Sequence, residues 1–350
     1  MVDGMRVLVL GAAGAAAYNF MRSISDAHHL IAADVNPLML QLAYTHGGPR
    51  IALTTPLGPQ RVDEINQIIR EHNIDFVHAQ PDPEVAWLAQ HARQLDAATF
   101  VPPASVVNAC QDKLKTASIL GDLAARSMPV ENLHEQIASL NHDAWLRLRK
   151  GAGAMGALRV TEHETARTWI EHWRTQRAAY GDWMLAEYLP GDNLSWTGIY
   201  RSGELVVSVA KRRDHLMSAN THPASVSSTA SVQTIIRRRD INETCEAAVQ
   251  LLDPHADGIW MFDLKENAHA EPKITECNIG RFGTTSLMYR AAGCNLPLIY
   301  LRTATGDTTP TRRDPCEWGR QWIRQPDMGC MLADNTWQPL TVEIEEKLAA

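Results

Sequence analysis

The sequence lacks the excess of basic residues that is typical of proteins that bind nucleic acids or acidic membranes. Its 33 Lys and Arg residues are outnumbered by 40 Asp and Glu residues, which gives a formal net charge of −7. The run Arg237 to Arg239 is too short to form a basic patch. We therefore expect small-molecule partners, and neither nucleic acid nor a membrane.

The sequence also lacks paired cysteines and long apolar runs. None of the six cysteines is spaced as C-x-x-C, which argues against a zinc site and a disulfide framework and favours reduced thiols. No apolar run is long enough to span a bilayer. The first apolar stretch is short and leads directly into a glycine turn, which is not the pattern of a signal peptide. A cytoplasmic enzyme is the expectation.

Length and composition are those of an ordinary globular protein. The 350 residues are too many for one compact core and fit two or three lobes. Hydrophobic residues make up 45% and charged residues 21%, so disorder is not expected.

The first hundred residues alternate between strand and helix patterns. Met5–Leu10 and His29–Asp34 are predicted strands, and a glycine turn between them opens a helix. Val62, Ile65, Ile68 and Ile69 mark the face of a later helix. Further strands are expected over Ile74–Ala79 and Thr99–Val101, with a helix between them. The pattern predicts an open parallel sheet of about a hundred residues.

The glycine turn allows a second interpretation. Gly11 and Gly14 follow a strand, and Asp34 comes about twenty residues later, as in dinucleotide-binding units. The spacing is G-x-x-G-x-x-A and not G-x-G-x-x-G, and such turns also serve only to pack a helix close to a strand. NAD binding is therefore a minor alternative.

A second glycine-rich element lies between two predicted strands. Trp145–Arg149 alternates apolar and basic residues, Lys150–Gly156 reads K-G-A-G-A-M-G, and Leu158–Val160 returns as the paired strand. Glycines at 151, 153 and 156 let backbone amides approach anionic oxygens, and Arg147 or Lys150 supplies charge. This pattern favours a loop that covers phosphate, although it also fits a plain hairpin.

A hairpin near the C-terminal third carries candidate metal ligands. Ile259–Leu264 and Lys273–Asn278 are predicted strands joined by a polar turn over Asn267–Glu271. Asp263 can then face Glu276 across the pair, with Asn278 on the same face. Two carboxylates and an amide suit Mg²⁺, and Arg281 just beyond could neutralise phosphate. The alternative is a hairpin whose acids merely face solvent.

Four motifs in order carry a resemblance to a known family. They are Asp112-Lys113, the cationic glycine hairpin, A-E-Y-L-P-G-D over 186–192, and D-L-K over 263–265 with I-T-E-C-N-I-G-R over 274–281. In this order they resemble the ATP-grasp family, most closely the large-subunit type of carbamoyl-phosphate synthase. The resemblance implies an α/β and α+β fold: a Rossmann-like pre-ATP-grasp domain over 1–110, then the two lobes of the ATP-grasp fold. Its small lobe would span 111–190 and its C-terminal lobe, with the metal site, 191–310. A tail over 311–350 would pack on the lobes.

The resemblance also implies roles for individual residues. ATP would lie between the lobes, with Lys113 and Arg147 on its phosphates and Glu187, Tyr188 and Leu189 as the hinge beside adenine. Asp263, Glu276 and Asn278 would hold Mg²⁺, for which Mn²⁺ can substitute, and Arg281 would face the transferred phosphate. Arg147 and Arg281 are thus the catalytic candidates. Lys150, Gly151, Gly153 and Gly156 would cover the phosphates. Asp192 stands where the family commonly has a ribose-binding glutamate and could replace it.

The implied activity is an ATP-dependent carboxylate–amine or carboxylate–nucleophile ligase. The acid would be phosphorylated to an acyl phosphate and then attacked by an amine, with release of ADP and phosphate. A homodimer is left open. The alternatives are an NAD(P)-dependent oxidoreductase built on the N-terminal turn and a non-catalytic ATP-binding regulatory protein.

Two further stretches have less definite interpretations. Lys211–Thr229 occupies the place where ATP-grasp proteins handle substrate, although a mobile polar loop is the simpler reading. Arg312–Leu340 is a tail in which Trp318, Trp322 and Trp337 are expected to pack onto the lobes.

Overall fold

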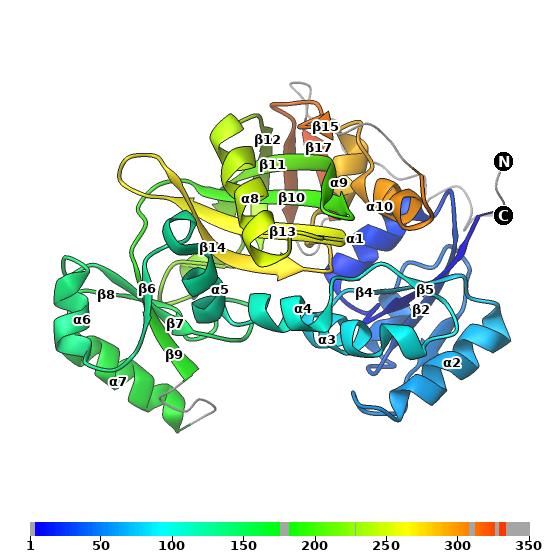
Figure 1. Cartoon of the computed structure of the whole chain (residues 1–350), viewed down its shortest axis with the longest axis horizontal. Helices are drawn as coiled ribbons and strands as arrows, with labels where there is room; N and C mark the ends of the chain where they lie inside the picture. The colour runs from blue at the N-terminus through cyan, green and yellow to red at the C-terminus, as the bar shows by residue number, and fades with distance from the viewer. Residues whose placement is uncertain (1–3, 176–181, 228, 308–311, 326–328, 334–350) are drawn as a thin grey trace.

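The structure is a computed structural model that describes residues 4–175, 182–227, 229–307, 312–325 and 329–333. Within these residues the strands form three sheets (Figure 1). The chain builds a parallel sheet first, then a small antiparallel sheet, and finally a large sheet whose pairings are antiparallel except for that of β15 with β11. This order agrees with the predicted fold class.

The N-terminal domain is an open parallel sheet with helices. Its strand order is β3-β2-β1-β4-β5. The strands are short apolar runs such as Arg6–Leu10, in which every residue after Arg6 is buried, as expected for a parallel sheet covered on both faces. The elements are β1 (Arg6–Leu10), α1 (Ala15–Ile24), β2 (His29–Asp34), β3 (Arg50–Ala52), α2 (Arg61–His72), β4 (Phe76–Ala79), α3 (Asp82–His91) and β5 (Ala98–Thr99).

Two helices lead from this domain into the small lobe. They are α4 (Ala104–Cys110) and α5 (Lys113–Leu120), and both pack against β14 of the large sheet. The small lobe has the strand order β6-β9-β7-β8. Its elements are β6 (Ser127–Pro129), α6 (Leu133–Ser139), β7 (Ala144–Leu148), β8 (Leu158–Val160), α7 (His163–Arg174) and β9 (Trp183–Glu187).

The large lobe is a long sheet with the order β14-β13-β10-β11-β12-β16-β17, to which β15 adds beside β11. Helix α8 packs against the strands of this sheet. Helices α9 and α10 lie between the sheet and α1 of the N-terminal domain. The elements are β10 (Asn193–Arg201), β11 (Glu204–Leu216), β12 (Ala230–Ile236), α8 (Arg239–Leu252), β13 (Gly258–Glu266), β14 (Pro272–Ile279), α9 (Ser286–Ala291), α10 (Leu296–Ala304), β15 (Arg312–Arg313), β16 (Gln321–Gln325) and β17 (Gly329–Ala333).

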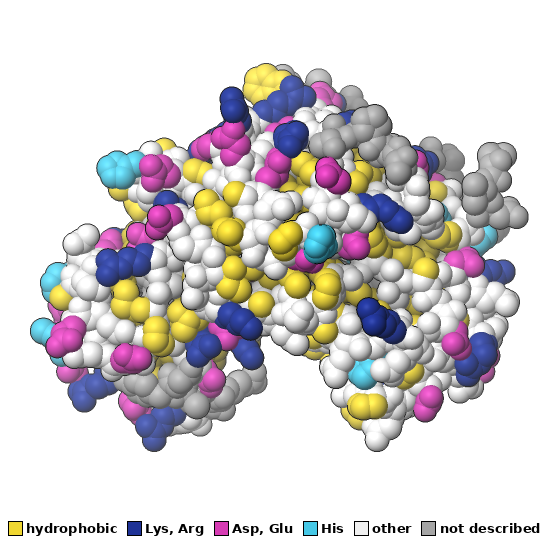
Figure 2. Space-filling model, viewed as in Figure 1, with side chains coloured by type: hydrophobic (Ala, Val, Ile, Leu, Met, Phe, Trp, Pro, Cys, Tyr) yellow, Lys and Arg dark blue, Asp and Glu magenta, His cyan; other side chains and the backbone are white. Residues whose placement is uncertain are grey.

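The N-terminal domain and the large lobe share their hydrophobic cores. One core joins Val7 and Phe20 to Ile259 and Tyr300, and another joins Leu10 to the large sheet. The small lobe has a core of its own, formed around Leu146 and Trp183. Figure 2 shows that the surface is hollowed between the small lobe and the N-terminal domain. The small lobe therefore packs as a separate unit against a combined body made of the other two parts.

The C-terminal tail differs from its prediction. Residues 312–325 do not only cover the lobes but extend the large sheet as β15 and β16. Trp322 is fully buried there, as expected, because it lies in β16. Trp318 is 66% exposed, so its predicted packing is wrong; it lies in the turn before β16, outside the sheet. Trp337 lies outside the described residues.

Two other predicted segments have different boundaries. The strand expected over Thr99–Val101 is the short β5, which begins one residue earlier and ends at Thr99, so that Phe100 and Val101 lie outside it. The expected loop over Lys211–Thr229 begins as a strand, since β11 runs to Leu216 and pairs with β12. Only the part after Leu216 is a connection. Among the described helices, none combines the length and apolar character needed to cross a bilayer.

Candidate functional site

A cavity of about 350 Å³ lies between the small lobe and the large lobe. The glycine-rich loop covers one side, the segment after β9 forms another, and β13 and β14 form the floor. The polar side chains that line it are Lys113, Arg147, Lys150, Glu187, Tyr188, Asn193, Arg213, Ser225, Ser227, Asp263, Lys265, Thr275 and Glu276.

Asp112 fixes the start of α5 and thereby the place of Lys113. Its carboxylate caps the helix by accepting from the N–H groups of Leu114 and Lys115, at 3.2 and 3.3 Å. Arg149 donates to both carboxylate oxygens, at 3.2 and 2.6 Å. Burial raises the pKa of Asp112, but the bonds from Arg149 and the helix amides outweigh it, and the net pKa is lowered. The first helical turn is thus bound to the end of β7.

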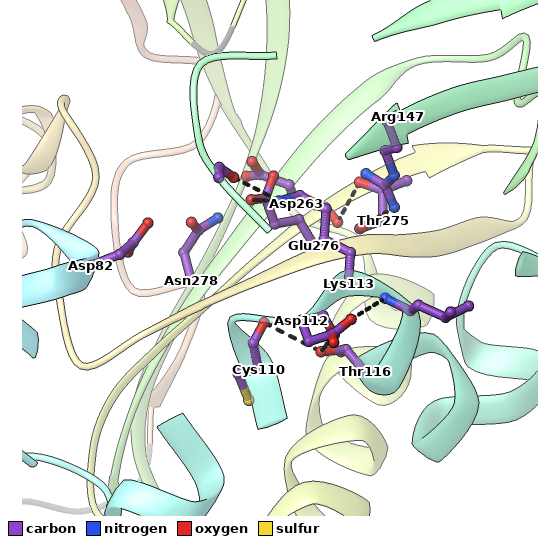
Figure 3. Close-up of polar contacts among 12 residues, drawn as sticks. Asp82, Cys110, Asp112, Lys113, Thr116, Arg147, Asp263, Thr275, Glu276 and Asn278 are labelled. Atoms are coloured by element: carbon purple, nitrogen blue, oxygen red, sulfur yellow. Dashed lines mark hydrogen bonds and ion pairs between the residues drawn. The ribbon is translucent and has the colours of Figure 1, made fainter. Parts of the chain in front are cut away.

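Lys113 bridges the glycine-rich loop and the hairpin floor. Its Nζ donates to the carbonyl oxygen of Gly151 at 2.7 Å and lies 3.1 Å from Oε1 of Glu276. The lysine is buried, with a side chain only 9% exposed, so this ion pair is shielded from water. Figure 3 shows Lys113, Glu276 and Asp263 close together.

The hairpin has the predicted register. Asp263 on β13 lies directly opposite Glu276 on β14, which confirms the cross-strand pairing. The register shifts immediately afterwards, so that Thr275 is an extra residue on β14. Its carbonyl oxygen accepts from Nη2 of Arg147 at 2.6 Å, a contact between the two lobes (Figure 3). Burial lowers the pKa of Arg147, whereas the carboxylates of Glu276 and Asp263 act in the opposite direction.

Each carboxylate at the floor is paired with a cation from another element. Glu276 pairs with Lys113 of α5, and Asp263 forms an ion pair with Arg213 of β11. Both Asp263 and Arg213 are largely buried, with side chains 19% and 15% exposed. The charges of the two floor carboxylates are therefore balanced by two cations.

The third candidate ligand lies beside a different arginine. Asn278 is buried, and its Oδ1 accepts from Nη2 of Arg281 at 2.5 Å. Arg281 also forms an ion pair with Asp82 of the N-terminal domain. In Figure 3 the side chains of Asp82 and Asn278 point toward one another. Arg281 is thus shared between the end of β14 and the start of α3.

The glycine-rich loop needs glycine at its end. Gly156 has φ +73°, and a Cβ there would lie 2.8 Å from the ring of Trp183 in β9. The backbone of this loop therefore packs directly on the small-lobe core, where a side chain would not fit.

The segment after β9 is held by cations. Arg159 lies over the ring of Tyr188, 3.8 Å from its centroid, and Lys265 donates to the carbonyl oxygen of Leu189. Trp145 lies near the same ring, with 6.3 Å between the two centroids. A flat, partly apolar wall with backbone groups at its edge is suited to an aromatic base.

The structure brings most of the predicted residues to one cavity. Those that line it are Lys113, Arg147, Lys150, Gly151, Gly153, Glu187, Tyr188, Leu189, Asp263 and Glu276. Gly156, Asp192, Asn278 and Arg281 are described but do not line it. Asp192 is about half exposed and lies 3.8 Å from Arg212.

Sequence reasoning missed two cations in the site. Arg213 was placed in a loop of uncertain role, but it lies in β11 and pairs with Asp263 of β13 across the single intervening strand β10. Lys265, two residues after Asp263, belongs to the D-L-K motif and was given no role. Alternation along an extended β11 would have identified Arg213.

The N-terminal glycine turn has a structural role. Asp34, the candidate ribose ligand, is buried and accepts from the N–H groups of Ala13 and Asn36 at 3.0 and 2.8 Å. Its carboxylate oxygens are thus engaged by the turn itself. This arrangement gives no support to the NAD alternative.

Comparisons with other proteins identify the fold. No family model matches the sequence, and a search of curated proteins gives no match. Solved structures do match. The N5-carboxyaminoimidazole synthetase of Staphylococcus aureus, complexed with ADP, aligns with a TM-score of 0.71 at 11% identity, over 93% of this chain and 83% of that one.

Two other structures align over nearly the same length. The biotin carboxylase domain of the Hydrogenobacter thermophilus 2-oxoglutarate carboxylase, in complex with MgADP, ADP and bicarbonate, has a TM-score of 0.70 at 12% identity, over 92% of this chain and 74% of that one. The L-amino acid ligase of Bacillus licheniformis has a TM-score of 0.65 at 13% identity, over 92% and 79%. These are ATP-grasp proteins, and the chain has the ATP-grasp fold. The predicted fold is confirmed.

Proposed function

We propose that this protein is an ATP-dependent ligase that joins a carboxylic acid to an amine or another nucleophile through an acyl phosphate. The observation that carries the proposal is the arrangement of Asp263 and Glu276, paired across a hairpin and facing Lys113 and Arg147 beneath a glycine-rich loop. Carboxylates on one wall and cations on the other suit a metal-bound polyphosphate. The ADP and MgADP complexes of two of the similar structures support the same ligand.

The residues at the floor fit Mg²⁺. Among the described residues no cluster of three or more His, Cys, Asp or Glu could hold a metal. The cavity offers the two carboxylates of Asp263 and Glu276, and the amide of Asn278 lies on the same strand as Glu276, outside the lining. Mg²⁺ typically takes one or two carboxylates and leaves its other positions to water and phosphate, and Mn²⁺ can occupy the same ligands. When bound, the metal would neutralise the outer phosphates of ATP and polarise them for transfer.

The two ion pairs at the floor would change when a metal-bound polyphosphate binds. Asp263 and Glu276 would hold the metal, and Arg213 and Lys113 would lose their carboxylate partners. Both cations would then be available for phosphate oxygens, so that little net charge would have to be desolvated. Arg147, which is fixed on the carbonyl of Thr275, adds a positive charge beside them.

Phosphoryl transfer then requires positioning and charge, and no side-chain nucleophile. The positive groups around the floor favour transfer of the γ-phosphoryl group to a carboxylate oxygen. Arg281 would face that group, and the amine would attack the resulting acyl phosphate with release of inorganic phosphate. Glu187, Tyr188 and Leu189 would form the hinge beside adenine, and Asp192 would serve the ribose.

The test is a screen of acids and amines in which ADP release from Mg-ATP is monitored. The proposal predicts ADP formation that requires an acid and rises with an amine. ADP formation that is indifferent to every acid and amine would favour the regulatory alternative. Reduction of NAD(P) without ATP would favour the oxidoreductase. The likeness to the carbamoyl-phosphate synthase type, the domain boundaries, the cytoplasmic location and the homodimer stay predictions.

A further inference from the structure

A residue of the N-terminal domain holds an arginine of the candidate site. Asp82 and Arg281 are 199 positions apart, and the carboxylate of Asp82 accepts from both Nε and Nη2 of Arg281. A carboxylate that accepts two parallel bonds fixes the plane of a guanidinium as well as its position. Arg281 is largely buried, with a side chain 16% exposed, so its orientation depends on these contacts.

The aspartate itself is rigidly placed. It is the first residue of α3 and stands between Pro81 and Pro83, whose rings restrict the backbone on both sides. Its own carbonyl oxygen accepts from Nε2 of Gln111 at 2.8 Å. A carboxylate in the first turn of a helix is also favoured by the helix dipole. The start of α3 is therefore a fixed support and not a flexible surface turn.

The same helix contacts the chain beside Arg281. Gly280 has φ +75°, and a Cβ there would lie 2.6 Å from Cγ1 of Val85 in α3. Two points of α3, one polar and one apolar, thus contact two consecutive residues after β14. From the other side, Asn278 accepts from Arg281 at 2.5 Å. The guanidinium is held between a candidate metal ligand and the N-terminal domain.

We propose that Asp82 is a positioning residue that orients Arg281 toward the phosphoryl group being transferred. The inference rests on the proposed function, in which Arg281 faces the transferred phosphoryl group. It assigns a part in the reaction to the N-terminal domain, none of whose described residues lines the cavity; Asp82 would act through Arg281, which lies just beyond the lining, three residues after Asn278. Without Asp82, Arg281 keeps its charge but loses two of its hydrogen bonds. We therefore expect loss of its contribution to the γ-phosphate position, with binding of ADP unaffected.

The test uses inorganic phosphate as a probe of that position, titrated calorimetrically into the full chain saturated with Mg-ADP. Because a hydrogen bond to a charged group contributes enough to change an affinity by roughly tenfold, Asp82→Asn should weaken phosphate binding by about that factor. Affinity for Mg-ADP should stay within about twofold. Asp82→Glu should recover part of the loss. Asp96→Asn is the matched control, since Asp96 pairs with Arg70 on the exposed surface of the same domain.

A double variant separates positioning from a general effect on the fold. Phosphate binding by Asp82→Asn combined with Arg281→Met should be no weaker than by Arg281→Met alone, because residues that act through one another are not additive. Additive losses, or an Asp82→Asn protein with the phosphate affinity of the wild type, would overturn the proposal.

The positioning role can also be judged without nucleotide. If the wild-type protein bound no Mg-ADP, the proposed function would be wrong. Hydrogen exchange would then show whether Asp82 holds the segment around Arg281. Amides over residues 278–283 should then exchange faster in Asp82→Asn than in Asp96→Asn. Equal exchange in the two variants would show that Asp82 does not hold this segment.

Discussion

Lys113 Nζ lies 3.1 Å from Oε1 of Glu276 and at the same time donates to the carbonyl oxygen of Gly151 at 2.7 Å. One buried ammonium thus connects the floor of the site to the loop that covers it. A ligand with phosphate groups and a divalent cation would compete for both contacts. The central prediction is that this site is built for such a ligand.

Glu276→Gln should abolish ADP formation while the fold stays intact. The substitution keeps the shape of the side chain but removes the charge that faces Lys113 and, in the proposal, the metal. If that charge contributes about 3 kcal/mol to the transition state, the rate falls by more than about a hundredfold. Asp263→Asn should act similarly. Glu271→Gln, in the exposed turn of the same hairpin, is the control. Near-normal turnover by Glu276→Gln would show that the hairpin is structural only.

Mg-ATP should stabilise the protein against heat, and NADH should not. A ligand that binds only the native state, at about a hundred times its dissociation constant, adds about 2.7 kcal/mol to the free energy of unfolding. The shift should shrink when EDTA removes the metal, because Asp263 and Glu276 would then repel the phosphates. A shift with NADH and none with Mg-ATP would reverse the interpretation of the two glycine elements.

Lys211 should make stability depend on pH. It is buried, with its Nζ 3.2 Å from Oγ1 of Thr285. Burial, and next the charge of Arg213, lowers the pKa of Lys211 to about 7 from its ordinary 10.5. Between these values the unfolded chain binds a proton that the folded protein lacks, so stability rises with pH across this window. Below pH 7 both states are protonated, and the cost of burying the charge is fully present.

Lys211→Met removes that cost. The melting temperature of this variant minus that of the wild type should therefore be largest near pH 6 and should decrease toward pH 9. The exposed Lys115 provides the control, since Lys115→Met should give a difference that does not vary with pH. A constant difference for Lys211→Met as well would contradict the assignment.

Gly156→Ala should destabilise the protein more than Gly47→Ala does. Both glycines have positive φ, which costs an alanine roughly 1 to 2 kcal/mol, but only Gly156 has a ring within 3 Å of the added carbon. The contact with Trp183 should add about 1 kcal/mol or more. Urea unfolding of the two variants measures the difference. Equal losses would mean that the loop does not pack on β9 as described.

Local patterns predicted the strand pairings of the site. The hairpin pattern placed Glu276 opposite Asp263, as observed. Alternation along the second strand placed Asn278 on the same face as Glu276, because side chains two residues apart share a face. The pattern of two strands joined by the glycine-rich loop likewise predicted the antiparallel pairing of β7 with β8. What alternation could not predict was the extra residue Thr275, whose displaced carbonyl accepts from Arg147.

Contacts between segments that are far apart in the chain could not be predicted from the sequence. Asp82 lies in a domain that sequence reasoning treated as a scaffold, and no local pattern relates it to Arg281. Arg213 was missed because the polar residues after Lys211 suggested a loop, whereas pairing with β12 keeps them extended. Trp318 was expected to be buried from its residue type alone, but its place in a turn leaves it exposed. In each case the contacts with distant segments determine the position of the side chain, and local sequence patterns do not reveal those contacts.

The most direct test is to identify the nucleotide product when Mg-ATP is supplied with the acid and amine found in the screen. In the proposed site the cations would surround the terminal phosphates, so the account predicts ADP and inorganic phosphate, formed in strict dependence on the acid. Positional labelling should place an oxygen of the acid in the released phosphate, as expected if an acyl phosphate forms and is displaced by the amine. AMP and pyrophosphate as the products would contradict the account.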